Sequence, residues 1–385
     1  MRKIHVLFAS RLVEEKWVDL LIKVIQKILT DSVLSENIYW HIASNWPYEN
    51  LIKELQEAHS ERITYYGKID QEKLANLYRN CSILLMPSRF LETFWMTALE
   101  ARMCGIIVVW PRKWWLTSFI EEVTQIDENF PVDSIVWILR EIIHWEKETY
   151  NNPSLEEFSE NAWKERFYNT FSQGERIMII HDYKELIWWA EYYVQSILEF
   201  IRSHDYRGNL YSYTWKTSPW KRRIMFIFSI FSFWRYFEVK NILESFSPES
   251  IWLHSILRYI GPWGIYAVRK YKKSHPKTNI ILAHHDVGLL AAFPQHIEQE
   301  HEIPDSRALK DFIPQKLSPW KRMLSITKWL YREILMYILP KDTKHMIFSS
   351  FLQKKIEKNF AWAEIIVFPH SCNEKIFFPL TKEEA

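Results

Sequence analysis

Two carboxylates, Glu92 and Glu100, stand eight residues apart in the run Pro-Ser-Arg-Phe-Leu-Glu-Thr-Phe-Trp-Met-Thr-Ala-Leu-Glu-Ala at residues 87–101. The run is typical of a strand end followed by a turn and a helix. A carboxylate accepts hydrogen bonds from the vicinal hydroxyls of a sugar, and free amides at a helix N-terminus near residues 95–97 attract a diphosphate. A solvated helix with two ordinary glutamates is the alternative. Because the neighbouring signals agree, we favour a site for a phosphorylated sugar.

Two cations stand close together nearer the N-terminus. Arg11 follows an apolar strand, and Lys16 precedes an amphipathic helix. Both can converge at the carboxyl edge of a sheet, where they would clamp a diphosphate and offset the charge that grows on it as a leaving group. A surface loop in which these cations pair with Glu14 and Glu15 is the alternative interpretation.

A third candidate is the run Ala-His-His-Asp at residues 283–286, which ends another predicted strand. Adjacent strand residues point to opposite faces, so His284 and His285 do not easily bind one metal ion. A histidine at a strand end is often a hydrogen-bonded structural residue. A catalytic role for His285 and a structural one therefore both remain open.

The elements that position these residues alternate between short apolar runs and amphipathic segments. Strands are predicted at 4–9, 38–43, 63–66, 82–86 and 106–109, and helices at 18–29, 48–59, 71–80 and 96–104. A polar helical stretch follows to about residue 170, with a break at 172–174. A second series has strands at 176–181, 251–254, 279–284, 345–349 and 365–368, and helices at 191–202, 264–273 and 352–359. This alternation predicts an α/β protein with two Rossmann-like domains, residues 1–172 and 175–385, whose ligands bind at the carboxyl ends of parallel strands.

Composition narrows the class of partner and compartment. The chain has 385 residues, 49 Lys plus Arg and 47 Asp plus Glu, so its net charge of +2 does not favour nucleic acid. The three cysteines are far apart and lack the spacing of a disulfide framework or a zinc site, which fits a reducing cytosol. No signal peptide is evident, and the longest apolar run, residues 224–233, is about half a bilayer span.

Tryptophan and glycine are used in unusual proportions. The chain has 20 tryptophans and 7 glycines, whereas average usage predicts roughly 27 glycines in this length. Several tryptophans lie in turns and loops, where glycine is favoured because it reaches positive φ. We therefore hypothesise that the gene encodes glycine with UGA at many of these codons. An aromatic-rich sequence with genuine tryptophans is the alternative. The glycine positions that we predict are 17, 46, 95, 110, 114, 115, 188, 189 and 362.

The runs Ser-Arg-Leu-Val-Glu-Glu-Lys-Trp-Val-Asp, Ala-Ser-Asn-Trp-Pro-Tyr, Tyr-Tyr-Gly-Lys and Pro-Ser-(x)3-Glu-Thr-Phe-Trp-(x)4-Glu-Ala resemble the donor domain of glycosyltransferase family 4, retaining enzymes of the GT-B fold. The resemblance covers nearly all of residues 1–172. It implies that Glu92 contacts the transferred sugar and Glu100 the ribose, and that no metal or other cofactor is needed at the diphosphate. Further donor-binding residues implied by it are Arg11, Lys16, Gly67, Lys68, Phe94, Trp95 and Met96.

The second half is similar to the acceptor domain of the same family. Its first strand is followed by Trp188-Trp189-Ala-Glu, where the family has a Gly-Gly-Ala-Glu loop, and the resemblance implies that His285 lies near the donor sugar with Asp286 as support. The run His-Ser-Cys-Asn at 370–373 departs from the usual Asn-Gly-Val-Asp. The order of the two halves is also reversed. A circular permutation or a segment of a tandem enzyme would explain that order.

The function expected from these features is retaining hexosyl transfer from a nucleotide sugar to a cell-surface glycan or lipid-linked precursor. A catalytically inactive subunit or sugar-binding partner is the alternative, whereas a dinucleotide-dependent oxidoreductase is disfavoured because Gly-x-Gly-x-x-Gly is missing even with glycines restored. Basic and aromatic residues mix at 220–233 and 320–339. Both stretches could lie on the inner face of the cell membrane, but helices packed in the core are the simpler interpretation.

Overall fold

The computed structural model describes most of the chain and divides it into two compact units. The described residues are 3–12, 16–44, 47–88, 96–111, 124–127, 129, 131–144, 155–182, 189–212, 231–254, 256, 260–285, 287–291, 303, 308–313 and 318–379. Unit 1 comprises residues 1–163, 295–300 and 370–385, and unit 2 comprises 164–294 and 301–369. The predicted donor-binding and acceptor-binding domains, residues 1–172 and 175–385, have other boundaries than these two units. Which residues bind the donor and which the acceptor stays a prediction.

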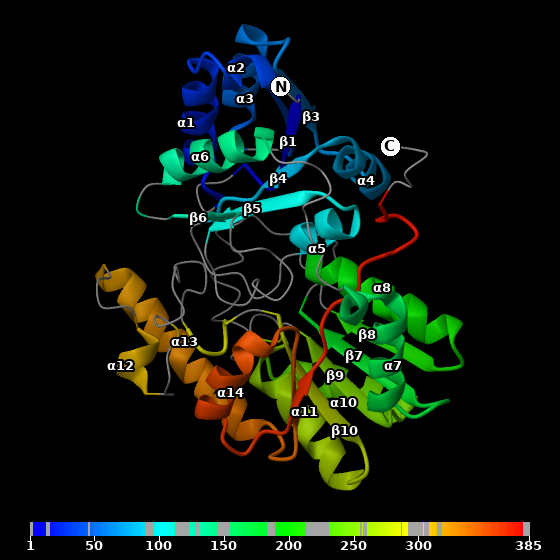
Figure 1. The fold of residues 1–385 in the computed structure, drawn as a ribbon. Helices are drawn as coiled ribbons and strands as arrows, with labels where there is room; N and C mark the ends of the chain where they lie inside the picture. Colours follow the sequence, from blue (N-terminus) through cyan, green and yellow to red (C-terminus); the bar gives the residue numbers. More distant parts are fainter. Residues whose placement is uncertain are drawn as a thin grey trace. The chain divides into compact units, whose positions relative to one another are not determined.

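Unit 1 is built on a parallel six-stranded sheet in the order β3-β2-β1-β4-β5-β6 (Figure 1). The strand order reverses between β1 and β4, and in such sheets ligands bind beyond the carboxyl ends of the strands at this switch point. The strands are β1 (Ile4–Ala9), β2 (Ile38–Ala43), β3 (Ile63–Gly67), β4 (Ile83–Leu85), β5 (Ile107–Pro111) and β6 (Gln125–Ile126). The helices are α1 (Val18–Leu29), α2 (Leu34–Asn37), α3 (Glu49–Ala58), α4 (Gln71–Asn80), α5 (Met96–Met103) and α6 (Pro131–His144).

Unit 2 contains a second parallel six-stranded sheet, in the order β12-β11-β10-β9-β7-β8. Its order reverses between β7 and β9. The strands are β7 (Arg176–His181), β8 (Arg207–Ser212), β9 (Ser250–His254), β10 (Asn279–His284), β11 (Lys344–Ile347) and β12 (Ile365–Val367). Its helices include α8 (Trp189–Ser203), α10 (Trp234–Phe246), α11 (Gly261–Ser274), α12 (Leu309–Phe312), α13 (Pro319–Ile338) and α14 (Gln353–Asn359), while η5 (Glu156–Phe158) and α7 (Glu160–Thr170) lie between the two sheets in sequence. The predicted fold class is confirmed.

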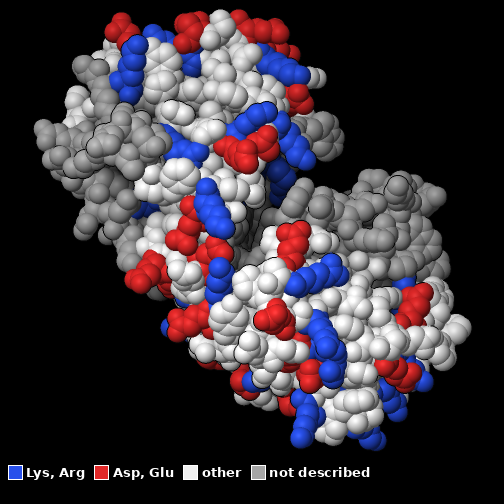
Figure 2. All heavy atoms as spheres, turned by 90° about the vertical axis from the view of Figure 1, so that its right-hand side faces the viewer, with Lys and Arg blue, Asp and Glu red and all other residues white. Residues whose placement is uncertain are grey.

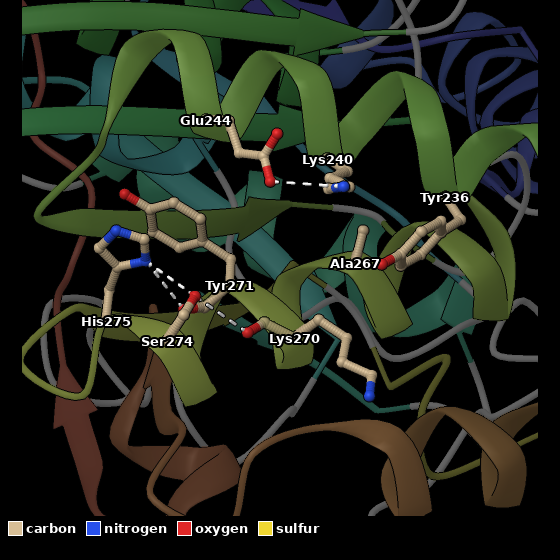
Figure 3. A pocket seen from close by; sticks show the side chains of 8 residues that line it. All are labelled: Tyr236, Lys240, Glu244, Ala267, Lys270, Tyr271, Ser274 and His275. Atoms are coloured by element: carbon tan, nitrogen blue, oxygen red, sulfur yellow. Dashed lines mark hydrogen bonds and ion pairs between the residues drawn. The ribbon is translucent and has the colours of Figure 1, made fainter.

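Charged side chains of both signs are interspersed on the face shown in Figure 2, which agrees with the small net charge of the chain. A hollow lies between α10 and α11, and its lining includes the ion pair of Lys240 and Glu244 and the side chains of Ser274 and His275 (Figure 3). Its lining runs from Tyr236, near the start of α10, to His275, directly after α11, so the hollow lies along the two helices and not in the loops that follow the strands, where a ligand is expected.

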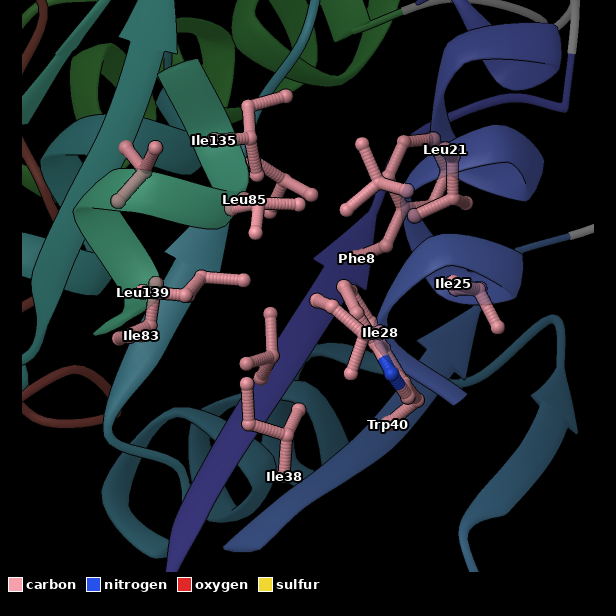
Figure 4. Close-up of a cluster of buried hydrophobic side chains, with 14 of the residues drawn as sticks. Phe8, Leu21, Ile25, Ile28, Ile38, Trp40, Ile83, Leu85, Ile135 and Leu139 are labelled. Atoms are coloured by element: carbon pink, nitrogen blue, oxygen red, sulfur yellow. The ribbon is translucent and has the colours of Figure 1, made fainter. Parts of the chain in front are cut away.

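The core of unit 1 forms because α1 is amphipathic. Val18, Leu21, Val24 and Ile28 recur at helical spacing and are fully buried against the sheet and against α6, as Figure 4 shows for part of this cluster. Trp40 of β2 packs in the same cluster. The packing fixes β1, and so the position where the chain leaves the sheet before Arg11.

The C-terminal segment 370–379 packs on unit 1. The Arg79 guanidinium donates to the Ile376 carbonyl at 2.8 Å, and the rings of Tyr78 and Phe377 are 6.0 Å apart. The Cys372 amide donates to the Phe158 carbonyl at 3.1 Å. This segment follows the last strand of unit 2 and covers α4 of unit 1, which the sequence did not indicate.

Most predicted strands are found within one or two residues of their predicted bounds. Strand β8 escaped prediction because Arg207-Gly208-Asn209 begins a polar edge strand without an apolar run. Glycine is needed at position 208 because a Cβ atom there would lie 2.5 Å from the Ile201 side chain of α8. The predicted break at 172–174 agrees with Gly174, whose φ is +77°.

Candidate active site

The two residues of the predicted diphosphate clamp lie near the carboxyl edge of the first sheet. Strand β1 ends at Ala9, beside the β1/β4 switch point, and Arg11 follows two residues later with an exposed side chain. Lys16 is half-buried directly before α1. The Ser44 hydroxyl donates to the Ser10 carbonyl and ties the ends of β2 and β1 together. Both cations are therefore held near the edge where the topology predicts a ligand.

The residue that begins α1 has a backbone conformation suited to glycine. Trp17 is the N-cap of α1, with φ 56° and ψ 41°, and its side chain makes no capping hydrogen bond. A left-handed conformation costs a residue with a Cβ roughly 1–2 kcal/mol. Positive φ at this position agrees with the hypothesis that Trp17 stands where glycine is required.

Other predicted glycine positions look different. Trp110 is fully buried within β5, and neither Trp110 nor Trp362 has a positive φ. Trp189 is the first residue of α8. Positions 46, 95, 114, 115 and 188 lie outside the described residues. The hypothesis as a whole stays a hypothesis, with backbone support at position 17.

Glu100 is the described member of the predicted carboxylate pair. It lies in the second turn of α5 with only 8% of its surface exposed, and the Tyr78 hydroxyl of α4 donates to its Oε2 at 3.4 Å. Burial raises the pKa of Glu100 to about 8, against a smaller lowering by the Tyr78 hydrogen bond. The carboxyl group of Glu100 is thus mostly protonated at neutral pH, and its Oε2 already accepts a hydrogen bond from the Tyr78 hydroxyl in this structure. Its contact with a ribose stays a prediction.

Gly67 and Lys68, which are predicted to bind the donor, lie at the end of β3 and directly after it. Gly67 has φ +65°, and a Cβ there would meet no heavy atom within 4 Å. Glycine is therefore favoured at this position because of its backbone conformation and not because of a lack of space. Lys68 is exposed. Met96 begins α5 and is half-buried, whereas Glu92, Phe94 and Trp95 lie outside the described residues.

The carboxyl edge of the second sheet carries a row of histidines at its own switch point. His181 ends β7 and is the register partner of His254, which ends β9. His254 Nδ1 lies 2.7 Å from Nε2 of His285, directly after β10. The His285 ring also stacks on Phe348 with centroids 4.6 Å apart. His285 is therefore held by contacts from neighbouring elements.

The electrostatic environment keeps His285 uncharged. Burial, and secondarily the nearby His181, lower its pKa to about 3. A neutral imidazole donates one hydrogen bond and accepts another, as a positioning group must. His284 instead pairs with His345 at 2.9 Å, so the two adjacent histidines have different partners, as the strand geometry predicts.

Sequence reasoning missed His181, His254 and Asp182. Asp182 is fully buried after β7, and its Oδ1 accepts the Ile260 amide at 2.8 Å before α11 begins. The available signal was a histidine at the end of each of three predicted strands. Asp286 and Trp188 lie outside the described residues. Among the described residues, no three His, Cys, Asp or Glu side chains form a group suited to a metal ion, and no helix is both long and apolar enough to cross a membrane.

Comparison with known proteins finds a family match over the first part of the chain. Residues 1–162 match the family model described as "Glycosyl transferases group 1". A Klebsiella pneumoniae protein described as an "Uncharacterized 41.2 kDa protein in cps region" is 31% identical over 107 residues, which are 28% of this chain. The match spans about a quarter of that relative's length, 27%.

Solved structures with partial similarity include glycosyltransferases. The catalytic domain of cholesterol-alpha-glucosyltransferase from Helicobacter pylori is 18% identical, with a TM-score of 0.30, over 36% of this chain and 88% of its own. The pneumococcal O-GlcNAc transferase GtfA, solved with UDP and GlcNAc, is 21% identical, with a TM-score of 0.30, over 36% of this chain and 28% of its own.

Proposed function

We propose that this protein is a glycosyltransferase that transfers a hexose from a nucleotide-sugar donor to a glycan or lipid-linked acceptor with retention of configuration. The observation that carries the proposal is the family match over residues 1–162, which contains the β1/β4 switch point with Arg11 and Lys16 beside it. A cell-surface polysaccharide is the proposed product class, and the cytoplasm, with peripheral contact at the inner face of the cell membrane, is the proposed location.

In the proposed reaction, the bond between the anomeric carbon and the donor phosphate oxygen breaks, and a bond to an acceptor oxygen forms on the same face of the sugar. Arg11 and Lys16 offset the charge that develops on the departing diphosphate, so no metal ion or other cofactor is invoked there. The acceptor proton passes to that diphosphate. Glu92 holds the transferred sugar, Glu100 the ribose, and residues 67–68 and 94–96 the rest of the donor.

His285 is proposed to contact the transferred sugar, and Trp188 and Trp189, the latter at the start of α8, are proposed to lie beside the acceptor. The low pKa of His285 supports a hydrogen bond from a neutral imidazole rather than a cation at this point. The catalytically inactive subunit or sugar-binding partner remains the alternative, because a chain that binds donor without turnover would have the same fold.

The test is nucleoside diphosphate release from a panel of UDP, GDP and ADP sugars, with and without glycan and lipid-linked acceptors. In a form of the protein with glycine restored at the predicted positions other than 110, Arg11→Ala and Lys16→Ala should each lower turnover by about 100-fold, the scale for removing one preorganised charge. The matched control is Lys23→Ala, which replaces an exposed lysine on α1 and should leave turnover unchanged. Donor binding without product would favour the inactive alternative, and full activity of both clamp variants would remove the clamp.

A further inference from the structure

Helix α13 carries an exposed apolar stripe along its whole length. Its 20 residues span about 30 Å at 1.5 Å per residue. Ser325, Tyr331, Arg332, Leu335 and Met336 form the buried face. The stripe on the opposite face consists of Trp320 (64% exposed), Met323 (50%), Ile326 (36%), Leu330 (49%), Ile334 (40%) and Tyr337 (82%).

The spacing of these residues shows that the stripe is not a set of isolated exposed apolar side chains. Its members recur every three or four residues, so they follow one side of the helix and form a continuous apolar row. Isolated exposed apolar residues are normal on any protein, but a contiguous row marks a surface that contacts a protein partner or a membrane. Sequence analysis favoured a core-packed helix here. The structure shows that only one face of the helix is packed.

Charge around the stripe distinguishes between these partners. Helix α11 contacts α13 (Figure 1). Each of the two helices contains four lysines or arginines, and together they contain one acidic residue, Glu333, which pairs with Arg332 at 2.9 Å. The whole chain has nearly equal numbers of basic and acidic residues. The excess of positive charge is therefore local to this pair of helices.

The positions of the cations fit a negatively charged surface beside the stripe. Lys321 and Arg322 are exposed in the first turn of α13. At the other end, the Arg269 guanidinium of α11 donates to the Tyr337 carbonyl at 3.0 Å and lies 5.9 Å from the centre of its ring. Tryptophan and tyrosine at the two ends of the helix are the residues enriched at membrane interfaces.

We propose that α13 lies in the interface of a lipid bilayer with anionic headgroups, with the stripe inserted among the acyl chains and the exposed cations Arg269, Lys321 and Arg322 near the phosphates. Amphipathic helices with an aromatic apolar face and basic flanks bind in this way without spanning the bilayer. The proposal does not depend on glycosyl transfer, because it can be measured without donor or acceptor.

The apolar part of the proposal is tested by vesicle flotation of the full chain with phosphatidylcholine vesicles, alone or mixed with phosphatidylglycerol. The protein should float with the mixed vesicles. Leu330→Asp and Tyr337→Asp should each lower the vesicle partition coefficient about tenfold or more, because insertion of an apolar side chain is lost. Trp137→Asp on α6, where Trp137 is 55% exposed, is the matched control and should bind like the unchanged protein.

The electrostatic part is tested with the double variant Lys321→Gln and Arg322→Gln. Each cation near an anionic surface contributes about 1 kcal/mol, so the pair should lower the partition into mixed vesicles by about 30-fold and leave phosphatidylcholine binding nearly unchanged. The double variant Lys23→Gln and Lys73→Gln removes two exposed lysines of unit 1 as a control. Circular dichroism should show equal melting for all variants, since every substituted residue is exposed.

Three results would overturn the proposal. The unchanged protein could fail to float with mixed vesicles, or the stripe variants could bind like the Trp137→Asp control. Sedimentation could also show a dimer of the unchanged chain that Leu330→Asp dissociates, without vesicle binding, and the stripe would then be a contact between copies.

Discussion

His254 Nδ1 and His285 Nε2 lie 2.7 Å apart at the carboxyl edge of the second sheet, so one ring must donate a proton to the other. Because burial keeps His285 neutral, this contact fixes which of its nitrogens faces His254 and leaves the other directed elsewhere. His254 thereby acts as a positioning residue for His285.

Replacing His254 tests that relationship. His254→Phe should change the His285 tautomer, seen in nitrogen NMR shifts, and lower turnover about tenfold, the effect of losing one hydrogen bond of about 1.4 kcal/mol. Free nucleotide binding should be unchanged. His345→Phe is the matched control, since it breaks the similar His284–His345 contact and should spare the turnover. An unaltered His285 tautomer in His254→Phe would contradict the positioning role.

Stability should depend on Glu100 in a defined pH window. The folded pKa of about 8 lies above the ordinary value of 4.5, so between these values the folded state holds a proton that the unfolded state releases. Stability is therefore full below about pH 4.5 and lost as the pH rises through 8. Glu100→Gln should remove this loss and stabilise the protein at pH 8 by on the order of 1 to 3 kcal/mol, measured by urea unfolding.

The exposed residue Glu57 on α3 provides the comparison. Glu57→Gln should keep the same slope of unfolding free energy against pH as the unchanged protein. If Glu100→Gln also keeps that slope, the buried protonated carboxyl is absent in solution.

The left-handed backbone at Trp17 predicts a reversal of the usual order of alanine and glycine. Within ordinary helices and strands, a protein with glycine is less stable than the same protein with alanine by roughly 0.5–1 kcal/mol. At position 17, Trp17→Gly should be more stable than Trp17→Ala by about 1 kcal/mol, since both lack the indole and only alanine keeps the strained Cβ.

Position 110 supplies the opposite expectation. Trp110 is buried in a strand without positive φ, so Trp110→Ala should be more stable than Trp110→Gly, and both should be less stable than the unchanged protein. Thermal melting of the four variants measures both orders. A codon other than UGA at position 17 would separately contradict the hypothesis that the gene encodes glycine there.

The parts of the fold that could be predicted were those in which a short run of residues has a clear hydrophobic pattern. Residues 4–9 and 176–181 are continuous apolar runs, and they form buried central strands as predicted. The missed strand β8 is polar because it lies at a sheet edge, where only part of each side chain is buried.

The positions of Arg11 and His285 were predictable because each closely follows a strand, whereas their roles in binding and catalysis stay predictions. Contacts between distant residues were not predictable. The burial of Glu100 depends on Tyr78, 22 residues earlier, and the role of His254 depends on pairing of β9 with β10. No local spacing encodes either relationship.

The central claim is that unit 1 binds a nucleotide sugar at the β1/β4 switch point. Calorimetry with UDP, GDP and ADP sugars tests it most directly, on the printed chain and on a form with glycine at the predicted positions other than 110, where Trp110 is buried in β5. We predict that the glycine form binds one nucleotide class, that the printed form binds none, and that Arg11→Ala weakens binding whereas Lys23→Ala does not. Absence of donor binding by both forms, or equal binding by the two variants, would contradict the claim.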